Sequence, residues 1–181
     1  MATREKIFIP NEIYYITFTI LGWKSVFIKD EYCDLAYKWF DYIRKNYGNK
    51  IHGYVIMPSH LHVLIYITDK SPILSKLMQN AKRFLAYEIV ALLMRDHSEL
   101  LDYFAGRAET KKNAKHKIFK DRYDSKIIQT DKMLLEKLNY IHNNPCQAKW
   151  RLSGEPEDYK YSSAANYIKG RGFYEVDLLD F

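Results

Sequence analysis

The chain has 181 residues, 48% of them apolar, which fits one domain with a substantial core, and no run approaches the roughly 18 consecutive apolar residues of a membrane-spanning helix. Its two cysteines exclude a disulfide framework and a Cys-x-x-Cys metal site, and its start carries no secretory leader, so we expect a cytoplasmic protein with no membrane partner. The net charge of +6 is compatible with a polyanion such as nucleic acid without requiring one.

The first part of the chain predicts a strand, a helix and two further strands. Residues 13–20 alternate in polarity, which predicts a strand with one buried face. Residues 31–48 place apolar side chains at helical spacing, and Gly48 is suited to end that helix. Residues 51–57 and 60–67 predict two more strands, separated by a tight connection.

A long helix is predicted next. Ser71 is a natural N-cap, Pro72 suits the first helical position, and the apolar stripe runs to about Met94. Residues 95–117 are polar and basic, which predicts a loop or an insert.

The remaining elements complete a recognisable order. Residues 117–128 are expected to hold a fourth strand, and residues 130–144 a helix that is capped by Thr130 or Asp131 and ended by a proline. The succession strand, helix, strand, strand, helix, strand, helix is that of the ferredoxin-like split βαβ fold. We therefore expect an α+β fold with an antiparallel sheet, helices on one face and an open catalytic face.

Two histidines begin an otherwise apolar strand in the stretch "MPSHLHVLIYI", residues 57–67. Side chains alternate along a strand, so His60 and His62 share one face. The other face carries only apolar side chains, which belong under the helices: Leu61, Val63, Ile65 and Ile67. Two imidazoles at this spacing can bind one divalent ion, although a pair of half-buried surface histidines has the same spacing.

A two-histidine metal site needs a third ligand, and the sequence offers several. His52 and His142 are two candidates. The helix over residues 130–144 offers another, because Tyr140 lies away from its apolar face and Asn144 lies one turn further along the same edge. Without further information, these two would be an exposed tyrosine and a residue at a helix end.

The motifs together resemble those of a known family. "MPSHLHVLIYI", then "LNYIHNNPCQAKW" and "EDYKYSSAANY", in this order, resemble the HUH single-tyrosine transposases, and most of all the REP-associated tyrosine transposase branch of the IS200-like group. The resemblance covers roughly residues 8 to 168. Phe119 departs from it, because many relatives have tryptophan there, and residues 95–115 look individual.

The resemblance implies a function and a site. It implies a transposase and endonuclease that cleaves and rejoins single-stranded, hairpin-containing DNA through a 5′-phosphotyrosine intermediate. Tyr140 would be the nucleophile, and His60, His62 and Asn144 would hold Mg²⁺ or Mn²⁺. Residues 1–150 would form this domain and residues 151–181 an extension of it, in a monomer or a homodimer.

Several side chains are candidates for DNA contact. Basic residues could hold phosphates, and Tyr15 could stack a base on the open face. A solvated basic surface explains the lysines and arginines equally well. The basic candidates are Lys76, Lys82, Arg83, Lys115 and Arg122.

Two other function classes fit parts of the sequence. A noncatalytic ferredoxin-like nucleic-acid-binding module would need aromatic side chains on the open face, but neither the histidine pair nor Tyr140. A small zinc hydrolase could use His52, His60 and His62, yet the sequence shows no convincing acidic residue to act as its general base.

Overall fold

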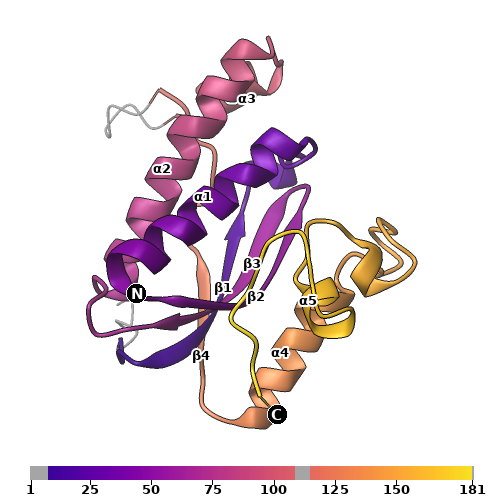
Figure 1. Ribbon diagram of the computed structural model, residues 1–181. Helices are drawn as coiled ribbons and strands as arrows, with labels where there is room; N and C mark the ends of the chain where they lie inside the picture. Colours follow the sequence, from indigo (N-terminus) through magenta and orange to yellow (C-terminus); the bar gives the residue numbers. More distant parts are fainter. Residues whose placement is uncertain (1–7, 109–114, 181) are drawn as a thin grey trace.

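The computed structural model describes residues 8–108 and 115–180. Its strands and helices are β1 (Glu12–Thr19), α1 (Asp30–Tyr47), β2 (Lys50–Met57), β3 (His60–Ile67), α2 (Leu74–Arg95), α3 (Leu100–Ala105), β4 (Asp124–Ile128), α4 (Asp131–Asn143) and α5 (Ala164–Ile168) (Figure 1). The strands pair in the order β2-β3-β1-β4, and each neighbouring pair is antiparallel. This is the predicted α+β, ferredoxin-like fold, in which β3 lies between β1 and β2.

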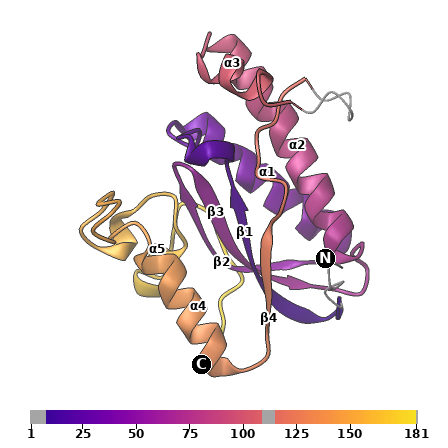
Figure 2. The ribbon, with the colours of Figure 1, turned by 180° about the vertical axis from the view of Figure 1, so that it is seen from behind.

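The two faces of the sheet carry different helices, as Figures 1 and 2 show. Helices α1 and α2 cover one face over the main core, which includes Phe18 of β1 and Val63 of β3. The fold class is the expected one, but the second face is not free of helices: α4 packs on it, and Leu138 contributes to a smaller cluster with Tyr15 and Leu64. The alternation of β1 and β3 therefore sorts the side chains as the sequence predicts, and it brings α4 onto the histidine-bearing face.

Two of the predicted helix ends are confirmed. Gly48 ends α1 with a left-handed backbone (φ 69°), and its N–H donates to the carbonyl oxygen of Arg44. Thr130 caps α4, because its Oγ1 accepts a hydrogen bond from the backbone N–H of Met133 at 3.2 Å. These caps fix where the two helices begin or end.

The predictions for residues 71–117 need correction. Helix α2 begins at Leu74 after Ile73, and the Ser71 hydroxyl donates to Asn49 Oδ1 at 2.8 Å instead of capping the helix. The stretch predicted as a loop contains α3, because its apolar residues, with Phe104 fully buried, join the main core.

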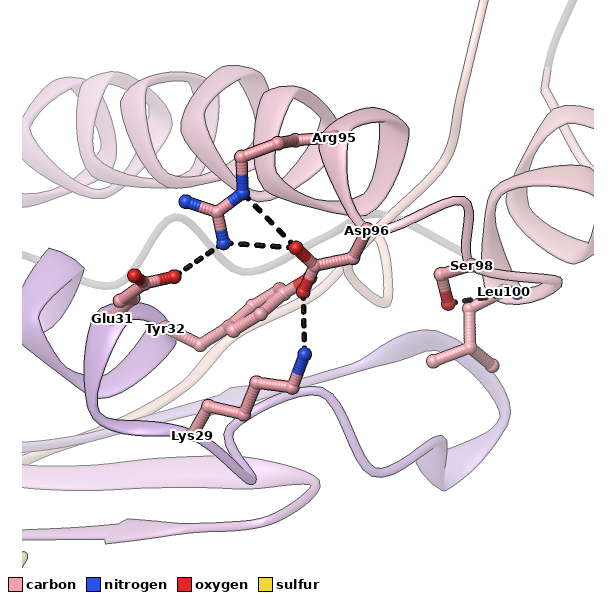
Figure 3. Close-up of polar contacts among 7 residues, drawn as sticks. All are labelled: Lys29, Glu31, Tyr32, Arg95, Asp96, Ser98 and Leu100. Atoms are coloured by element: carbon pink, nitrogen blue, oxygen red, sulfur yellow. Dashed lines mark hydrogen bonds and ion pairs between the residues drawn. The ribbon is translucent and has the colours of Figure 1, made fainter.

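A polar network joins the end of α2 to the start of α1 (Figure 3). Asp96 pairs with Lys29 at 2.8 Å and with Arg95 at 2.9 Å, and Arg95 also pairs with Glu31. The hydroxyl of Tyr32 donates to the same Asp96 carboxylate at 3.2 Å. The hydrogen bond from Lys29, aided by Arg95, lowers the pKa of Asp96 to about 2.

The C-terminal segment covers the outer edge of β2. The N–H of Ile56 donates to the carbonyl oxygen of Tyr161 at 2.8 Å, and the N–H of Asp177 donates to that of Ile51 at 2.8 Å. An exposed strand edge invites pairing with other chains, so this segment protects β2. None of the helices in the described residues is both long enough and apolar enough to cross a membrane.

Candidate active site

The two histidines lie on one face of the sheet at the start of β3, which is an inner strand. His60 pairs with Thr19 of β1 and Met57 of β2, and His62 follows two residues later on the same face. Their ring centroids are 4.8 Å apart, and both side chains are buried. The two imidazoles are therefore adjacent and buried on the same face of the sheet, as the alternation of β3 predicts.

Hydroxyl groups hold the inner nitrogen of each imidazole. His62 Nδ1 lies 2.8 Å from Tyr15 Oη and 2.8 Å from Thr17 Oγ1, and His60 Nδ1 lies 3.2 Å from Ser59 Oγ. When Nδ1 carries the proton, it donates to one of these oxygens and leaves the lone pair of Nε2 free. Such outer hydrogen bonds fix the tautomer and the ring orientation of metal-binding histidines.

Burial keeps both imidazoles neutral at pH 7. It lowers the pKa of His60 to about 4, with a smaller contribution from Lys149. It lowers the pKa of His62 to about 3, and the neighbouring His60, Lys137 and Lys149 add to this effect. The neutral form is the one that binds a metal ion.

Tyr140 reaches the histidine pair from α4. Its ring centroid lies 5.4 Å from that of His62 and 6.3 Å from that of Tyr15, and its side chain is 39% exposed. Leu138 and Ile141 on the same helix are buried against the sheet, which fixes α4 in place. The phenol is thus both adjacent to the imidazoles and accessible.

Asn144 follows Tyr140 by one helical turn and is fully buried. Within residues 8–108 and 115–180, neither its Oδ1 nor its Nδ2 has a hydrogen-bond partner, and the same is true of His62 Nε2. Buried polar atoms without partners are costly, so a bound ion or an ordered water is expected to satisfy them.

The donor set fits a divalent cation. Two neutral imidazoles and a carboxamide oxygen are ordinary ligands, and two of the three unpartnered atoms, His62 Nε2 and Asn144 Oδ1, are ones that a cation could engage. The described residues contain no group of three or more His, Cys, Asp and Glu side chains placed to hold a metal ion. The candidate set differs from such a group because its third member is Asn144.

The other two histidines considered as ligands have different partners. His52 Nδ1 lies 2.7 Å from the carbonyl oxygen of Asp177, and His142 Nε2 lies 2.9 Å from Ser163 Oγ. In β2, His52 is three residues from Val55, the partner of His62, which places it about 10 Å along the strand. The structure does not bring together the zinc-hydrolase triad.

The predicted DNA-contact residues are dispersed. Lys76, Lys82 and Arg83 lie on α2, which covers the face opposite the histidines. Lys82 donates to the carbonyl oxygens of Lys120 (2.7 Å) and Asp121 (3.2 Å), and burial lowers the pKa of Lys82 to about 8. It therefore anchors a loop.

Lys115 and Arg122 are exposed on the segment that leads to β4. Tyr15 is on the histidine face, as predicted, but it is buried with its hydroxyl at His62 and its ring beside Tyr140. Its ring is not open to a base, and the geometry favours a role in orienting His62.

Sequence reasoning missed three residues around the site. Lys137 Nζ lies 4.6 Å from the ring centroid of Tyr15 and 5.6 Å from that of Tyr140. The rings of Trp23 and Trp150 lie 5.5 Å and 5.3 Å from that of His60. The spacing of three residues between Lys137 and Tyr140 on one helix was a usable signal. The two tryptophans lie outside the long elements, and their positions gave no signal.

Comparison with known proteins supports the fold. A solved structure of a REP-associated tyrosine transposase bound to a REP hairpin matches with a TM-score of 0.67 over 100% of this chain and 95% of that chain, at 16% identity. A candidate transposase from Deinococcus radiodurans R1 matches with a TM-score of 0.49 over 78% of this chain and 97% of that chain, at 13% identity. No family model matches the sequence, and no curated protein matches it. The first likeness establishes a shared fold.

Proposed function

We propose that this chain is a metal-dependent transposase of the HUH single-tyrosine kind, which cleaves and rejoins single-stranded DNA through Tyr140. The observation that carries the proposal is the exposed phenol of Tyr140, with its ring 5.4 Å from that of His62. The shared fold with a transposase solved on a REP hairpin supports the same class of reaction and a hairpin-containing substrate.

The proposed reaction exchanges one phosphoester for another. The phenolic oxygen of Tyr140 attacks the scissile phosphorus in line, its proton passes to solvent, and the 3′ oxygen of the upstream nucleotide leaves and is protonated. The product is a 5′-phosphotyrosine and a free 3′-hydroxyl. Attack by a second 3′-hydroxyl reverses the step and rejoins strands without a nucleotide cofactor, because the covalent link retains the phosphoester.

A phenol is mostly protonated at neutral pH and is a poor nucleophile, so the phosphate must be activated. His60 Nε2, His62 Nε2 and Asn144 Oδ1 would hold Mg²⁺ or Mn²⁺, and the bound cation would polarise the phosphate and stabilise the charge of the transition state. The amine of Lys137, which lies over the ring of Tyr140, can pair with a phosphate oxygen beside the nucleophile.

The hydroxyl groups that contact His62 Nδ1 allow metal binding to be tested without any measurement of cleavage. Tyr15 and Thr17 both lie 2.8 Å from His62 Nδ1, and loss of such outer partners weakens metal binding about 10- to 100-fold. We expect the variant with both Tyr15→Phe and Thr17→Val to bind Mn²⁺ that much more weakly, as measured by the electron paramagnetic resonance signal of free Mn²⁺.

The main experiment looks for the covalent intermediate. The protein is incubated with end-labelled, hairpin-containing single-stranded DNA and Mn²⁺, and protein-linked label is separated on a denaturing gel. Tyr140→Phe should abolish the adduct and leave DNA binding intact. Tyr87→Phe is the matched control, because Tyr87 is 73% exposed and lies on α2.

Two outcomes contradict the proposal. An adduct that survives Tyr140→Phe would remove Tyr140 as the nucleophile. Binding without an adduct across hairpins of many sequences would favour the noncatalytic nucleic-acid-binding module. We further propose that residues 1–150 carry the reaction and residues 151–181 extend the same domain, in line with the pairing of Tyr161 and Asp177 with β2.

A further inference from the structure

Trp23 presents an open indole beside the candidate active site. Its side chain is 52% exposed, and its ring meets that of His60 edge-on at 5.5 Å. The amine of Lys120 lies 4.3 Å from the centroid of the same indole. A large apolar ring left in solvent next to a buried histidine pair is available to a ligand.

The backbone holds this indole firmly at the site. The N–H of Ile20 donates to the carbonyl oxygen of Ser59, beside His60, at 2.9 Å. The N–H of Leu21 donates to that of Ile118, close to Lys120, at 2.8 Å. The short turn Leu21–Trp23 is therefore attached both to the histidine strand and to the segment that carries the lysine.

The turn adopts an unusual conformation to present the ring. Gly22 and Trp23 both have left-handed backbone, with φ of 65° and 57°. A bulky residue rarely has positive φ, and such outliers gather at binding sites. A Cβ at Gly22 would lie 2.0 Å from Tyr103 Oη, so a larger residue there would also have to displace the Tyr103 side chain.

The pair of an indole and an ammonium group matches the chemistry of a nucleotide. Bases of any sequence stack on an indole face, and an ammonium group pairs with the adjoining phosphate. Among the described residues, Lys120 has no carboxylate partner within ion-pair distance, so its charge is available.

A second exposed aromatic ring with a lysine amine above it occurs elsewhere in the chain, but there the lysine has a carboxylate partner. Phe173 is 54% exposed beneath Lys160, whose amine lies 4.5 Å from the ring centroid. Lys160, however, is paired with Asp30 at 2.5 Å. Phe173 also packs against Tyr37 of α1, which belongs to the core on the face opposite the histidines.

We propose that Trp23 and Lys120 form a base-stacking subsite for a nucleotide next to the scissile phosphate. The assignment of that phosphate to the histidine pair rests on the proposed function. The stacking itself requires only single-stranded DNA and no cleavage, so the two claims can fail separately.

The test compares two strands of equal length and charge. Binding of dT12 and of a twelve-residue abasic strand is measured by fluorescence anisotropy, with Tyr140→Phe as the parent so that no covalent step occurs. Stacking of one base contributes a preference of about 5- to 140-fold for dT12 over the abasic strand. Trp23→Asn removes the ring and suits the left-handed backbone, and we expect it to abolish that preference.

Two further variants are controls. Trp23→Tyr retains a stacking face and should retain most of the preference, whereas Phe173→Ala should retain all of it. A preference that persists in Trp23→Asn overturns the subsite, and so does an equal loss of affinity for both strands, which would indicate that Trp23 only covers His60. Absence of any preference in the parent overturns it as well.

The denaturing gel separates the claim of a stacking subsite at Trp23 from the claim of cleavage by Tyr140. A preference that depends on Trp23, in a chain that forms no adduct, leaves the subsite and refutes cleavage by Tyr140. An adduct at Tyr140 with no role for Trp23 in the preference leaves the nuclease and refutes the subsite.

Discussion

The contact between β2 and α4 predicts that a single methyl group at Gly53 will disturb the site. A Cβ at Gly53 would lie 2.7 Å from Leu138 Cδ1, with Ser163 Oγ at 3.5 Å and Leu64 Cδ1 at 3.7 Å. Carbon atoms prefer separations of about 3.5–4.0 Å, so Leu138 must retreat by about 1 Å. It is buried between helix and sheet, and overpacking of this kind costs about 1–3 kcal/mol.

The same displacement should affect function. Tyr140 lies two residues from Leu138 on α4, and a misplacement of about 1 Å at a catalytic group can cost about 100-fold in rate. For Gly53→Ala we therefore expect a free energy of unfolding in urea that is lower by about 1–3 kcal/mol, and adduct formation that is slower by one to two orders of magnitude.

The matched control and a compensating change make this prediction refutable. A Cβ at Gly154 meets no atom within 4 Å, so Gly154→Ala should change the free energy of unfolding by no more than about 0.5 kcal/mol. Leu138→Val removes the clashing Cδ1 and should make Gly53→Ala less costly in the double variant. If Gly53→Ala behaves like Gly154→Ala in both assays, the described packing of α4 on β2 is wrong.

Three further predictions concern stability. Ser163→Ala removes the hydroxyl that accepts from a β2 backbone N–H at 2.9 Å and contacts His142 at 2.9 Å, and should lower the free energy of unfolding by about 1–3 kcal/mol in urea titrations. Gly48→Ala has free space but a φ of 69°, so it should cost about 1–2 kcal/mol, and no loss would contradict the left-handed cap. The lowered pKa of Asp96 means that the unfolded chain binds more protons than the folded chain between about pH 4 and pH 2, so the unfolding midpoint should fall across this window. Asp96→Asn should make the unfolding midpoint less dependent on pH in this window. The control Asp69→Asn should leave the dependence unchanged, because Asp69 has no ion pair among the described residues.

Much of the fold could be predicted because local patterns agree with the tertiary structure. In β3, the alternation of apolar residues with His60 and His62 sorts the two faces as expected. Gly48 acts through its own backbone conformation and Thr130 through a side-chain hydrogen bond to a residue three positions later, so both roles were visible in the local sequence. The predicted start of α2 was wrong because the Ser71 hydroxyl forms a hydrogen bond with Asn49, which is 22 residues away in the sequence. A hydrogen-bond partner that is distant in the sequence cannot be identified from the residues next to Ser71.

The features of the candidate site that depend on residue spacing within one element were predictable, and those that depend on packing between distant segments were not. Periodicity placed Tyr140 and Asn144 on one edge of α4, and alternation placed the two histidines on one face. The burial of Tyr15 and the positions of Trp23 and Trp150 depend on how distant segments pack, so no spacing indicated them. The side of the sheet on which the basic residues of α2 lie was hidden for the same reason, because a helical face does not tell which side of the sheet the helix covers.

The central claim is that Tyr140 forms the covalent link to DNA, and one measurement tests it most directly. Trypsin releases residues 138–149, "LNYIHNNPCQAK", in which Tyr140 is the only tyrosine. After reaction with hairpin-containing single-stranded DNA and Mn²⁺, followed by nuclease trimming, mass spectrometry should find this peptide with a nucleotide attached through its 5′ phosphate. A nucleotide on another tyrosine-containing peptide, or an unmodified 138–149 peptide from protein that demonstrably holds DNA covalently, would contradict the account.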